Sequence, residues 1–227
     1  MRFKDFEKTM SPGRVNRYLA ACNGDTKKTM MLYRLNLRLS QEMFTVISCF
    51  EVALRNAIDR HYLDRFGNDW VRDSAVQGGI FDHQNCSQTT NSINDEVRSL
   101  GNRYSHDKLI AGLGFGFWRY LFAPHQYQRA GSNLLDIFPA KPRSTAQTQY
   151  NQTFVFKQLA ALNEIRNRIA HHEPICFIPR QSVKDTTYAR QHYGHILQLF
   201  QWMTINEAAL LYGLDHINQV CDNIDSL

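Results

Sequence analysis

The chain has 227 residues, of which 43% are hydrophobic, 12% aromatic and 21% charged, a composition typical of a globular protein with a real core. Its formal net charge is +5 and its pI about 9.0, a mild basicity that suits a nucleic-acid partner without requiring one. The N-terminal segment MRFKDFEKTM lacks the apolar core of a secretory signal, and no run of about 18 apolar residues occurs. We therefore expect a cytoplasmic protein without a membrane span.

The number of cysteines is odd, and no two of them form a Cys-x-x-Cys pair. This pattern favours reduced, mostly structural thiols over a disulfide framework. They are Cys22, Cys49, Cys86, Cys176 and Cys221.

The first third of the chain predicts a short helix followed by a very long one. Ser11 resembles an N-cap before a first-turn proline, and Asn23-Gly24 ends that helix. Asp25 can cap the next helix, whose first strong stop is Gly67. Apolar residues recur there at steps of three and four, which indicates a buried face. They are Met43, Ile47, Phe50, Leu54, Ala57 and Ile58.

The remainder alternates between polar loops and apolar helices. Residues 71–105 are polar and glycine-bearing, and we expect a loop-rich insertion there, interrupted by a short helix near 95–100. Residues 109–122 are apolar, residues 139–150 predict a second loop, and helices are expected from about 153 and over about 190–212. The last presents Ile196, Leu199, Phe200 and Met203 on one face. Because no alternating strand pattern occurs, we predict an all-α fold and a single domain over 1–227.

The helix from 153 to 172 carries an arginine beside its apolar face. At 100° per residue, five apolar side chains cover about one third of the helix, and Arg166 falls inside this sector. Asn163, Asn167 and His171 form an adjacent polar strip at steps of four. A guanidinium at this border needs a partner, which could be a carboxylate, a carbonyl, a second subunit or a phosphate. The apolar residues are Val155, Leu159, Leu162, Ile165 and Ile169.

His171 and His172 occupy the last turn, since Pro174 forces Glu173 out of the helical region. A histidine beside an arginine and an asparagine has a natural chemistry on RNA. The imidazole can take a proton from a 2′-hydroxyl or give one to the leaving oxygen, while the guanidinium binds the phosphate. This chemistry requires no metal and no cofactor.

A structural interpretation competes with this one, because Arg-x4-His occurs by chance in many helices. In that interpretation Arg166 pairs with a core carboxylate and the two histidines cap helix carbonyls. Glu164 and Arg168, four residues apart, predict an ordinary surface ion pair.

The segment LNEIRNRIAHHEPI resembles the Arg-Asn-x3-His motif of HEPN domains, and in detail the Abi-like (abortive infection) family of bacterial proteins. Further stretches resemble that family in the same order, from about Ser11 to Gly213. They are FEVALRNAIDRHY (50–62), FGNDW (66–70), LIAGLGFGFWRYLF (109–122), IFP (137–139) and YGHILQLFQWM (193–203). The chain departs from the family at Gly114, where a serine is expected, and over 71–105.

The resemblance implies a helical HEPN-type bundle that dimerises symmetrically, with two motifs facing a composite cleft. It implies phage-defence or toxin–antitoxin-like roles, metal-independent RNA cleavage, and as partners RNA, a second copy and an antitoxin made of protein or RNA. Arg166, Asn167 and His171 match the catalytic motif, and His172, Glu173 and Pro174 match the Abi-like extension. Other HEPN proteins only bind RNA or a protein, so a non-catalytic module is the alternative, and a purely structural dimer is a third.

A second Arg-Asn…His arrangement, Arg55-Asn56 with His61, lies in the long helix. Arg55 and His61 are about 240° apart on a straight helix, which disfavours joint chemistry. Glu51, four residues before Arg55, favours a structural ion pair, although Arg55 and Asn56 could still line an RNA-binding cleft.

The other candidate motifs favour structural roles. GLGFGF (112–117) lacks the lysine of a phosphate loop, and its neighbouring aromatic residues are expected in the core. His171-His172-Glu173 lacks metal-ligand spacing, and His192 and His195 have no evident third ligand. A basic group in the N-terminal third predicts a solvated face, with an RNA-backbone track as the alternative. It consists of Arg14, Arg17, Lys27, Lys28, Arg34 and Arg38.

Overall fold

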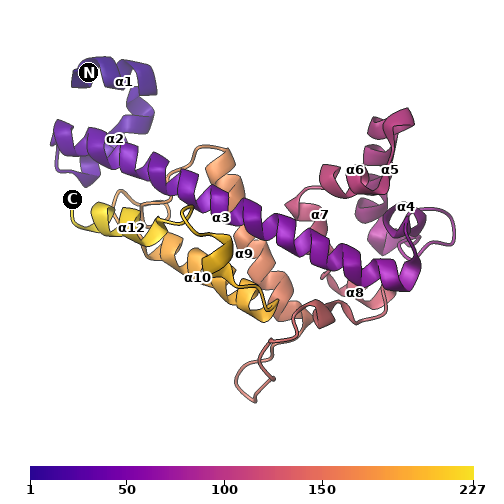
Figure 1. Ribbon diagram of the computed structural model, residues 1–227. Coiled ribbons are helices and arrows are strands. Elements are labelled where there is room, and N and C mark those ends of the chain that lie inside the picture. Colours follow the sequence, from indigo (N-terminus) through magenta and orange to yellow (C-terminus); the bar gives the residue numbers. More distant parts are fainter. The chain divides into compact units, whose positions relative to one another are not determined.

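The computed structural model describes residues 1–227 and is all-α, as predicted (Figure 1). Its only strand-like feature is an isolated antiparallel bridge between Phe177 and Lys184. The first half contains α1 (Phe3–Met10), α2 (Pro12–Ala21), α3 (Thr26–Phe66), α4 (Trp70–Ser74), α5 (Ser87–Leu100) and α6 (His106–Gly112). The second half contains α7 (Phe115–Tyr120), α8 (Pro124–Arg129), α9 (Gln152–Ala170), α10 (Thr187–Trp202), α11 (Glu207–Leu210) and α12 (Ile217–Asp225). Three 3-10 turns lie at 84–86, 101–103 and 134–137.

The chain forms two compact units. Unit 1 comprises residues 1–48, 164–198 and 207–227, and unit 2 comprises residues 49–163 and 199–206. The helices α3, α9 and α10 contribute residues to both units, so no single linker divides the chain. The single domain over 1–227 stays a prediction.

The long helix α3 begins and ends where the sequence predicts. Asn23 and Gly24 have positive φ angles of 51° and 82°, which ends α2. The Asp25 carboxylate then accepts hydrogen bonds from the backbone N–H groups of Lys27 and Lys28, at 2.9 and 3.0 Å, and so caps α3. Gly67, with a φ of 89°, follows its last residue.

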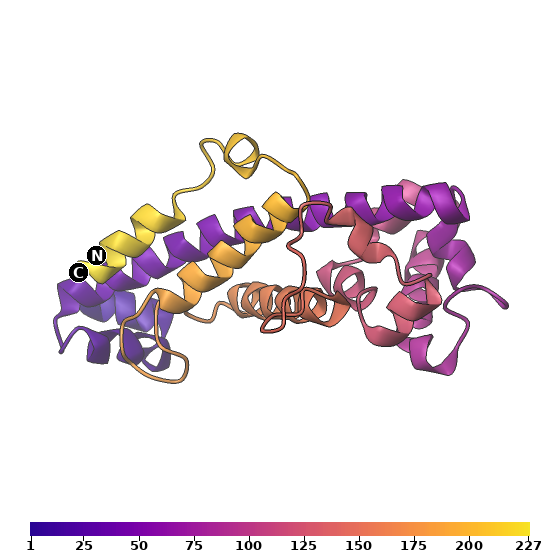
Figure 2. The ribbon, with the colours of Figure 1, turned by 90° about the horizontal axis from the view of Figure 1, so that it is seen from below.

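Unit 1 packs around the N-terminal half of α3. Figures 1 and 2 both show α12 alongside this half. Tyr18 of α2 contacts the rings of Tyr33 and Phe177, with centroids 4.9 and 5.0 Å away. The buried Glu42 carboxylate pairs with Arg38 at 2.7 Å and accepts the His216 backbone N–H at 3.1 Å, which fixes the start of α12 to α3.

Unit 2 has an aromatic core around Phe50, whose ring contacts Phe115 and Phe200 edge to face. A polar network supports it, because the Asp59 carboxylate accepts Trp70 Nε1 and bonds His106 Nε2, both at 2.8 Å. These bonds join α3 to α4 and α6.

The prediction of a loop over 71–105 is wrong for the second half of that segment. Residues 75–83 are turns and bends, but α5 runs from Ser87 to Leu100 and begins well before the short helix expected near 95. The residues at its start are poor helix formers, so propensity alone did not reveal it. Tertiary packing overrides that propensity, since Thr89 and Ile93 are buried.

Two helix boundaries also differ from the sequence interpretation. Ser11 precedes α2, but its φ is 70° and its side chain makes no capping bond; Pro12 alone holds the expected first-turn position. The last predicted helix ends at Trp202 rather than near 212, because Thr204 has a positive φ of 58°. Two separate helices, α11 and α12, follow it.

Several other expectations are confirmed. Residues 139–150 form a loop, and the predicted apolar faces of α9 and α10 are buried. All five cysteines are free, and burial raises the pKa of the Cys176 thiol to about 12 and that of Cys221 to about 11. Such thiols are inert at neutral pH, which fits a structural role. No helix is both long enough and apolar enough to pass through a bilayer.

Candidate functional site

The predicted motif lies at the C-terminal end of α9, within unit 1. Ile165 and Ile169 are buried as expected, whereas Asn167 is exposed. Arg166 is half-buried, and its Nε atom is shielded from solvent without a hydrogen-bond partner in the chain. The structural interpretation, in which a core carboxylate pairs with Arg166, therefore finds no support at this atom.

The end of α9 is closed by its own backbone. The N–H of His172 donates to the Ile169 carbonyl at 2.9 Å, and the N–H of Glu173 donates to the Arg168 carbonyl at 2.8 Å. This is the Schellman arrangement, with His172 in the left-handed conformation at a φ of 56°. Glycine normally takes this position because any Cβ is strained there. Main-chain N–H groups therefore cap the carbonyls at the end of α9, a role that the structural interpretation assigned to the imidazoles.

Arg168 holds the segment that follows. Its guanidinium donates to the Glu173 carboxylate at 3.2 Å and to the Pro174 carbonyl at 2.7 Å, and it lies over the Tyr188 ring at 4.7 Å. The predicted Glu164–Arg168 pair is wrong, because the turn after α9 brings these nearer partners to the arginine.

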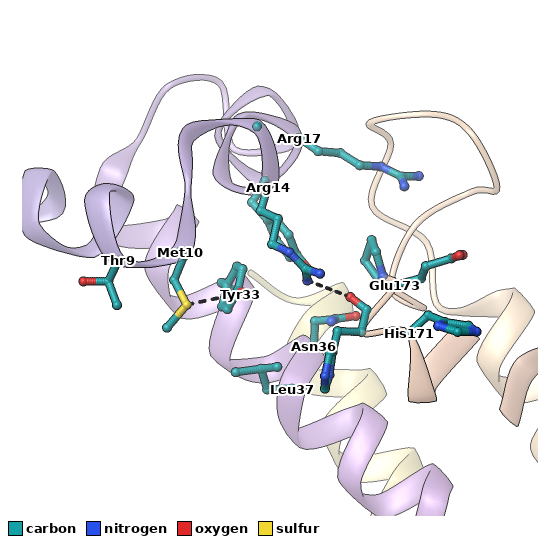
Figure 3. Close-up of a pocket in the computed structure, with 13 residues that line it drawn as sticks. Thr9, Met10, Arg14, Arg17, Tyr33, Asn36, Leu37, His171 and Glu173 are labelled. Atoms are coloured by element: carbon teal, nitrogen blue, oxygen red, sulfur yellow. Dashed lines mark hydrogen bonds between the residues drawn. The ribbon is translucent and has the colours of Figure 1, made fainter. Parts of the chain in front are cut away.

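The outward carbonyl of His172 is bound by α2. Arg14 Nη1 donates to it at 3.0 Å, across 158 residues of sequence (Figure 3). Arg17, one turn later, donates to the carbonyls of Gln181 and Ile178 at 2.8 and 3.0 Å. Arg17 is thus committed to the loop after α9, whereas Arg14 is exposed and uses one of its five donors.

These contacts surround an open cavity of about 560 Å³, within the range of small-molecule sites. Figure 3 shows its walls coming from α1, α2, the first half of α3 and the end of α9. The lining residues are Thr9, Met10, Gly13, Arg14, Arg17, Tyr18, Tyr33, Asn36, Leu37, His171, His172, Glu173 and Pro174.

The structure therefore brings together part of the predicted site. His171, His172 and Glu173 share this cavity, and the first two have exposed side chains. Arg166 and Asn167, from the same motif, are not among its lining residues. The cavity instead adds Arg14, an exposed guanidinium that uses one donor within the chain.

Asn36, a lining residue only 4% exposed, is not among the residues that the motifs predicted for the site. Its Oδ1 accepts the Ile175 backbone N–H at 2.9 Å and so fixes the chain just beyond Pro174. A pattern could have indicated it, because Asn36 interrupts the buried stripe of Leu32 and Leu39 at helical spacing. A polar residue on an apolar face needs a specific partner.

The second candidate motif lies in unit 2. Arg55 is half-buried with an unpartnered Nε, and Asn56 is exposed. His61 bonds Asn133 Oδ1 at 2.9 Å through Nε2, which is a structural contact. The Glu51–Arg55 pair and the role of Arg55 and Asn56 in binding stay predictions.

His192 and His195 lie on α10 with their ring centroids 6.1 Å apart. His192 is buried, and its Nδ1 bonds the Tyr188 carbonyl at 2.8 Å. Burial lowers the pKa of both imidazoles. No group of three or more His, Cys, Asp or Glu side chains is arranged to hold a metal ion.

The basic N-terminal group divides between two uses. Lys28 bonds the Leu227 carbonyl at 2.8 Å, and Arg38 pairs with Glu42, so with Arg17 three members are structural. Lys27 and Arg34 are exposed, as the solvated-face prediction expects.

The GLGFGF segment is structural. Gly114 stands at the N-cap of α7, and Phe115, Trp118 and Phe122 are buried, which confirms the core prediction for these three rings. Phe117 and Tyr120 are only half-buried.

The fold and the cavity define an all-helical protein with a histidine pair beside an arginine-rimmed groove. A family model described as Abi-like protein matches residues 1–176, so the chain belongs to the Abi-like protein family, whose name points to abortive infection and phage defence. The match begins before Ser11 and ends before α10, which leaves the block at 193–203 outside it. Comparisons with curated proteins and with solved structures found no match.

Proposed function

We propose that the protein is a metal-independent endoribonuclease of a phage-defence or toxin–antitoxin type system. One observation carries the proposal: the exposed imidazole of His171 lies on an open cavity whose rim also holds Arg14, a guanidinium with free donors. A proton-transfer group beside a phosphate-binding cation is the minimum that RNA cleavage by the 2′-hydroxyl requires.

In the proposed reaction His171 removes the proton of the 2′-hydroxyl, whose oxygen attacks the adjacent phosphorus. The bond from phosphorus to the 5′-oxygen breaks, and that oxygen takes up a proton. The products are a 2′,3′-cyclic phosphate and a free 5′-hydroxyl. Arg166, whose Nε has no partner in the chain, is proposed to bind the phosphate with Asn167 orienting it.

We further propose that the active form is a symmetric dimer, in which a second copy supplies the imidazole that protonates the leaving oxygen. Three apolar side chains of α3 support a second surface here, since Met31, Leu37 and Phe44 are 51%, 47% and 41% exposed. Leu37 and Phe44, seven residues apart, lie on the same side of the helix, and apolar side chains exposed together on one helix face mark an interaction surface.

The test incubates purified protein and total RNA with a chelator and maps the RNA ends. We expect cyclic-phosphate ends from the wild type and their loss in His171→Ala and Arg166→Ala. His125→Ala and Arg143→Ala are matched controls, since both side chains are exposed and lie in unit 2. Equal cleavage by the wild type and His171→Ala would refute the catalytic assignment.

One observation favours a second function, a non-catalytic RNA- or protein-binding module. Arg166 and Asn167 do not line the cavity that holds His171, so one chain does not assemble the whole motif around that cavity. Such a module would bind RNA with a steep salt dependence and release no cyclic-phosphate ends. Growth on induction separates the two, because only a nuclease gives an arrest that His171→Ala relieves.

A further inference from the structure

We infer that the cavity of unit 1 is a nucleotide-binding subsite, which takes one unstacked base of single-stranded RNA and holds its phosphate at the Arg14 rim. The assignment deepens the proposed action on RNA and rests on it. Three independent features of the cavity carry it: an amide donor without a partner in the chain, an apolar wall, and a cationic rim.

The amide belongs to Asn36. The residue is 4% exposed, and its Oδ1 is occupied by the Ile175 N–H. No hydrogen bond within the chain uses its Nδ2 group, although Asn36 lines the cavity (Figure 3). This NH₂ is not shielded from solvent, so it can donate to an acceptor placed in the cavity. Every nucleobase presents such acceptors on its edge.

The wall offers an apolar surface to a base. The Tyr33 ring is only 7% exposed and packs against Phe6 and Tyr18. Its hydroxyl bonds the Met10 sulfur at 3.5 Å, which fixes the thioether at the cavity. Leu37 lies on the same cavity and is 47% exposed. Apolar side chains can cover the face of an unstacked base, and single-stranded RNA is recognised through bases turned out of the stack.

The rim supplies the charge for the phosphate. Arg14 donates one hydrogen bond to the His172 carbonyl. This bond holds the guanidinium in place and leaves its other N–H groups for an anion. His171 lines the same cavity. A base seated against Asn36 would therefore be attached to a phosphate close to the proposed proton-transfer group.

The experiment titrates the full chain with the four nucleoside 5′-monophosphates and, separately, with inorganic phosphate, by calorimetry or NMR. Two variants test the site. Asn36→Asp keeps an oxygen for the Ile175 N–H and removes the NH₂ donor, and Leu37→Trp fills the cavity at an exposed position. The matched control is Val52→Trp, also on α3 and 43% exposed but not lining the cavity.

We expect saturable nucleotide binding at least tenfold tighter than phosphate binding. It should weaken at least tenfold in both test variants and stay unchanged in the control, with melting curves verifying that each variant is folded. Nucleotide and phosphate binding with equal affinity, or nucleotide binding that Leu37→Trp leaves intact, would overturn the subsite.

His171→Ala separates this inference from the proposed function. The variant should lose cleavage and keep nucleotide binding. If the wild type binds nucleotides but cleaves no RNA, the nuclease proposal fails and the subsite stands. If the wild type cleaves RNA but binds no nucleotide in the cavity, the subsite fails alone.

Discussion

The left-handed backbone of His172 gives the sharpest test of how α9 ends. With a φ of 56°, an L residue is strained by about 1–2 kcal/mol through its Cβ, and glycine is not. Glycine in turn loses about 0.5–1 kcal/mol through its freer unfolded chain. We therefore expect His172→Gly to be more stable than His172→Ala by about 0.5–1 kcal/mol.

The comparison of these two variants isolates the Cβ, because both remove the imidazole. Urea denaturation followed by circular dichroism measures the difference, provided the slopes of the two transitions agree. His172→Val, with a branched Cβ, should be the least stable of the three. A glycine variant that is no more stable than the alanine variant would mean that the end of α9 is not the Schellman turn described here.

The same glycine variant also tests the imidazole in function. It preserves the backbone carbonyl that Arg14 binds, so the position of α2 is retained. Glycine fits this backbone conformation better than histidine does. We therefore hypothesise that the His172 side chain has a function of its own. We expect His172→Gly to weaken RNA binding while stability rises.

Three further predictions concern single side chains. Gly114→Ser should raise stability by a few tenths of a kcal/mol in thermal melting, because serine can cap α7, the backbone there is extended and no atom lies within 4 Å of an added Cβ. Asn36→Leu should lower stability by about 1–3 kcal/mol in urea denaturation, since the buried Ile175 N–H loses its acceptor; a neutral result would contradict the bond. Burial lowers the pKa of His192, so the imidazole binds a proton more weakly in the folded protein than in the unfolded chain. The contribution of His192 to stability is therefore complete above about pH 6.5. It falls as the pH drops below that value, by at most about 1.4 kcal/mol per pH unit. His192→Gln should therefore flatten the fall in melting temperature between pH 7 and pH 5, and an unchanged slope would contradict the assignment.

Apolar spacing predicted the long helices because their burial is periodic. Met43, Ile47 and Leu54 lie on the buried face of α3, and Leu159 and Ile165 on that of α9. Local backbone chemistry predicted the start of α3, since Asp25 needs only its own neighbours to cap the helix. Such features depend on residues a few positions apart, which a sequence displays directly.

The features that escaped prediction depend on residues far apart in the chain. Thr89 and Ile93 stabilise α5 through burial rather than through helix propensity. Nothing near His172 indicates that Arg14 binds its carbonyl, because 158 residues separate them. The sequence motif predicted the histidines of the candidate site, whereas the residues of the other cavity walls could be identified only in the folded chain.

The way in which unit 1 is divided along the chain has a consequence for protein synthesis. One wall of the cavity is made at the beginning of translation and the other only after the whole of residues 49–163 has left the ribosome. A nascent or prematurely terminated chain that stops before His171 therefore carries no assembled groove. The order in which the parts of unit 1 are produced thus delays any function of the cavity until the chain is nearly complete.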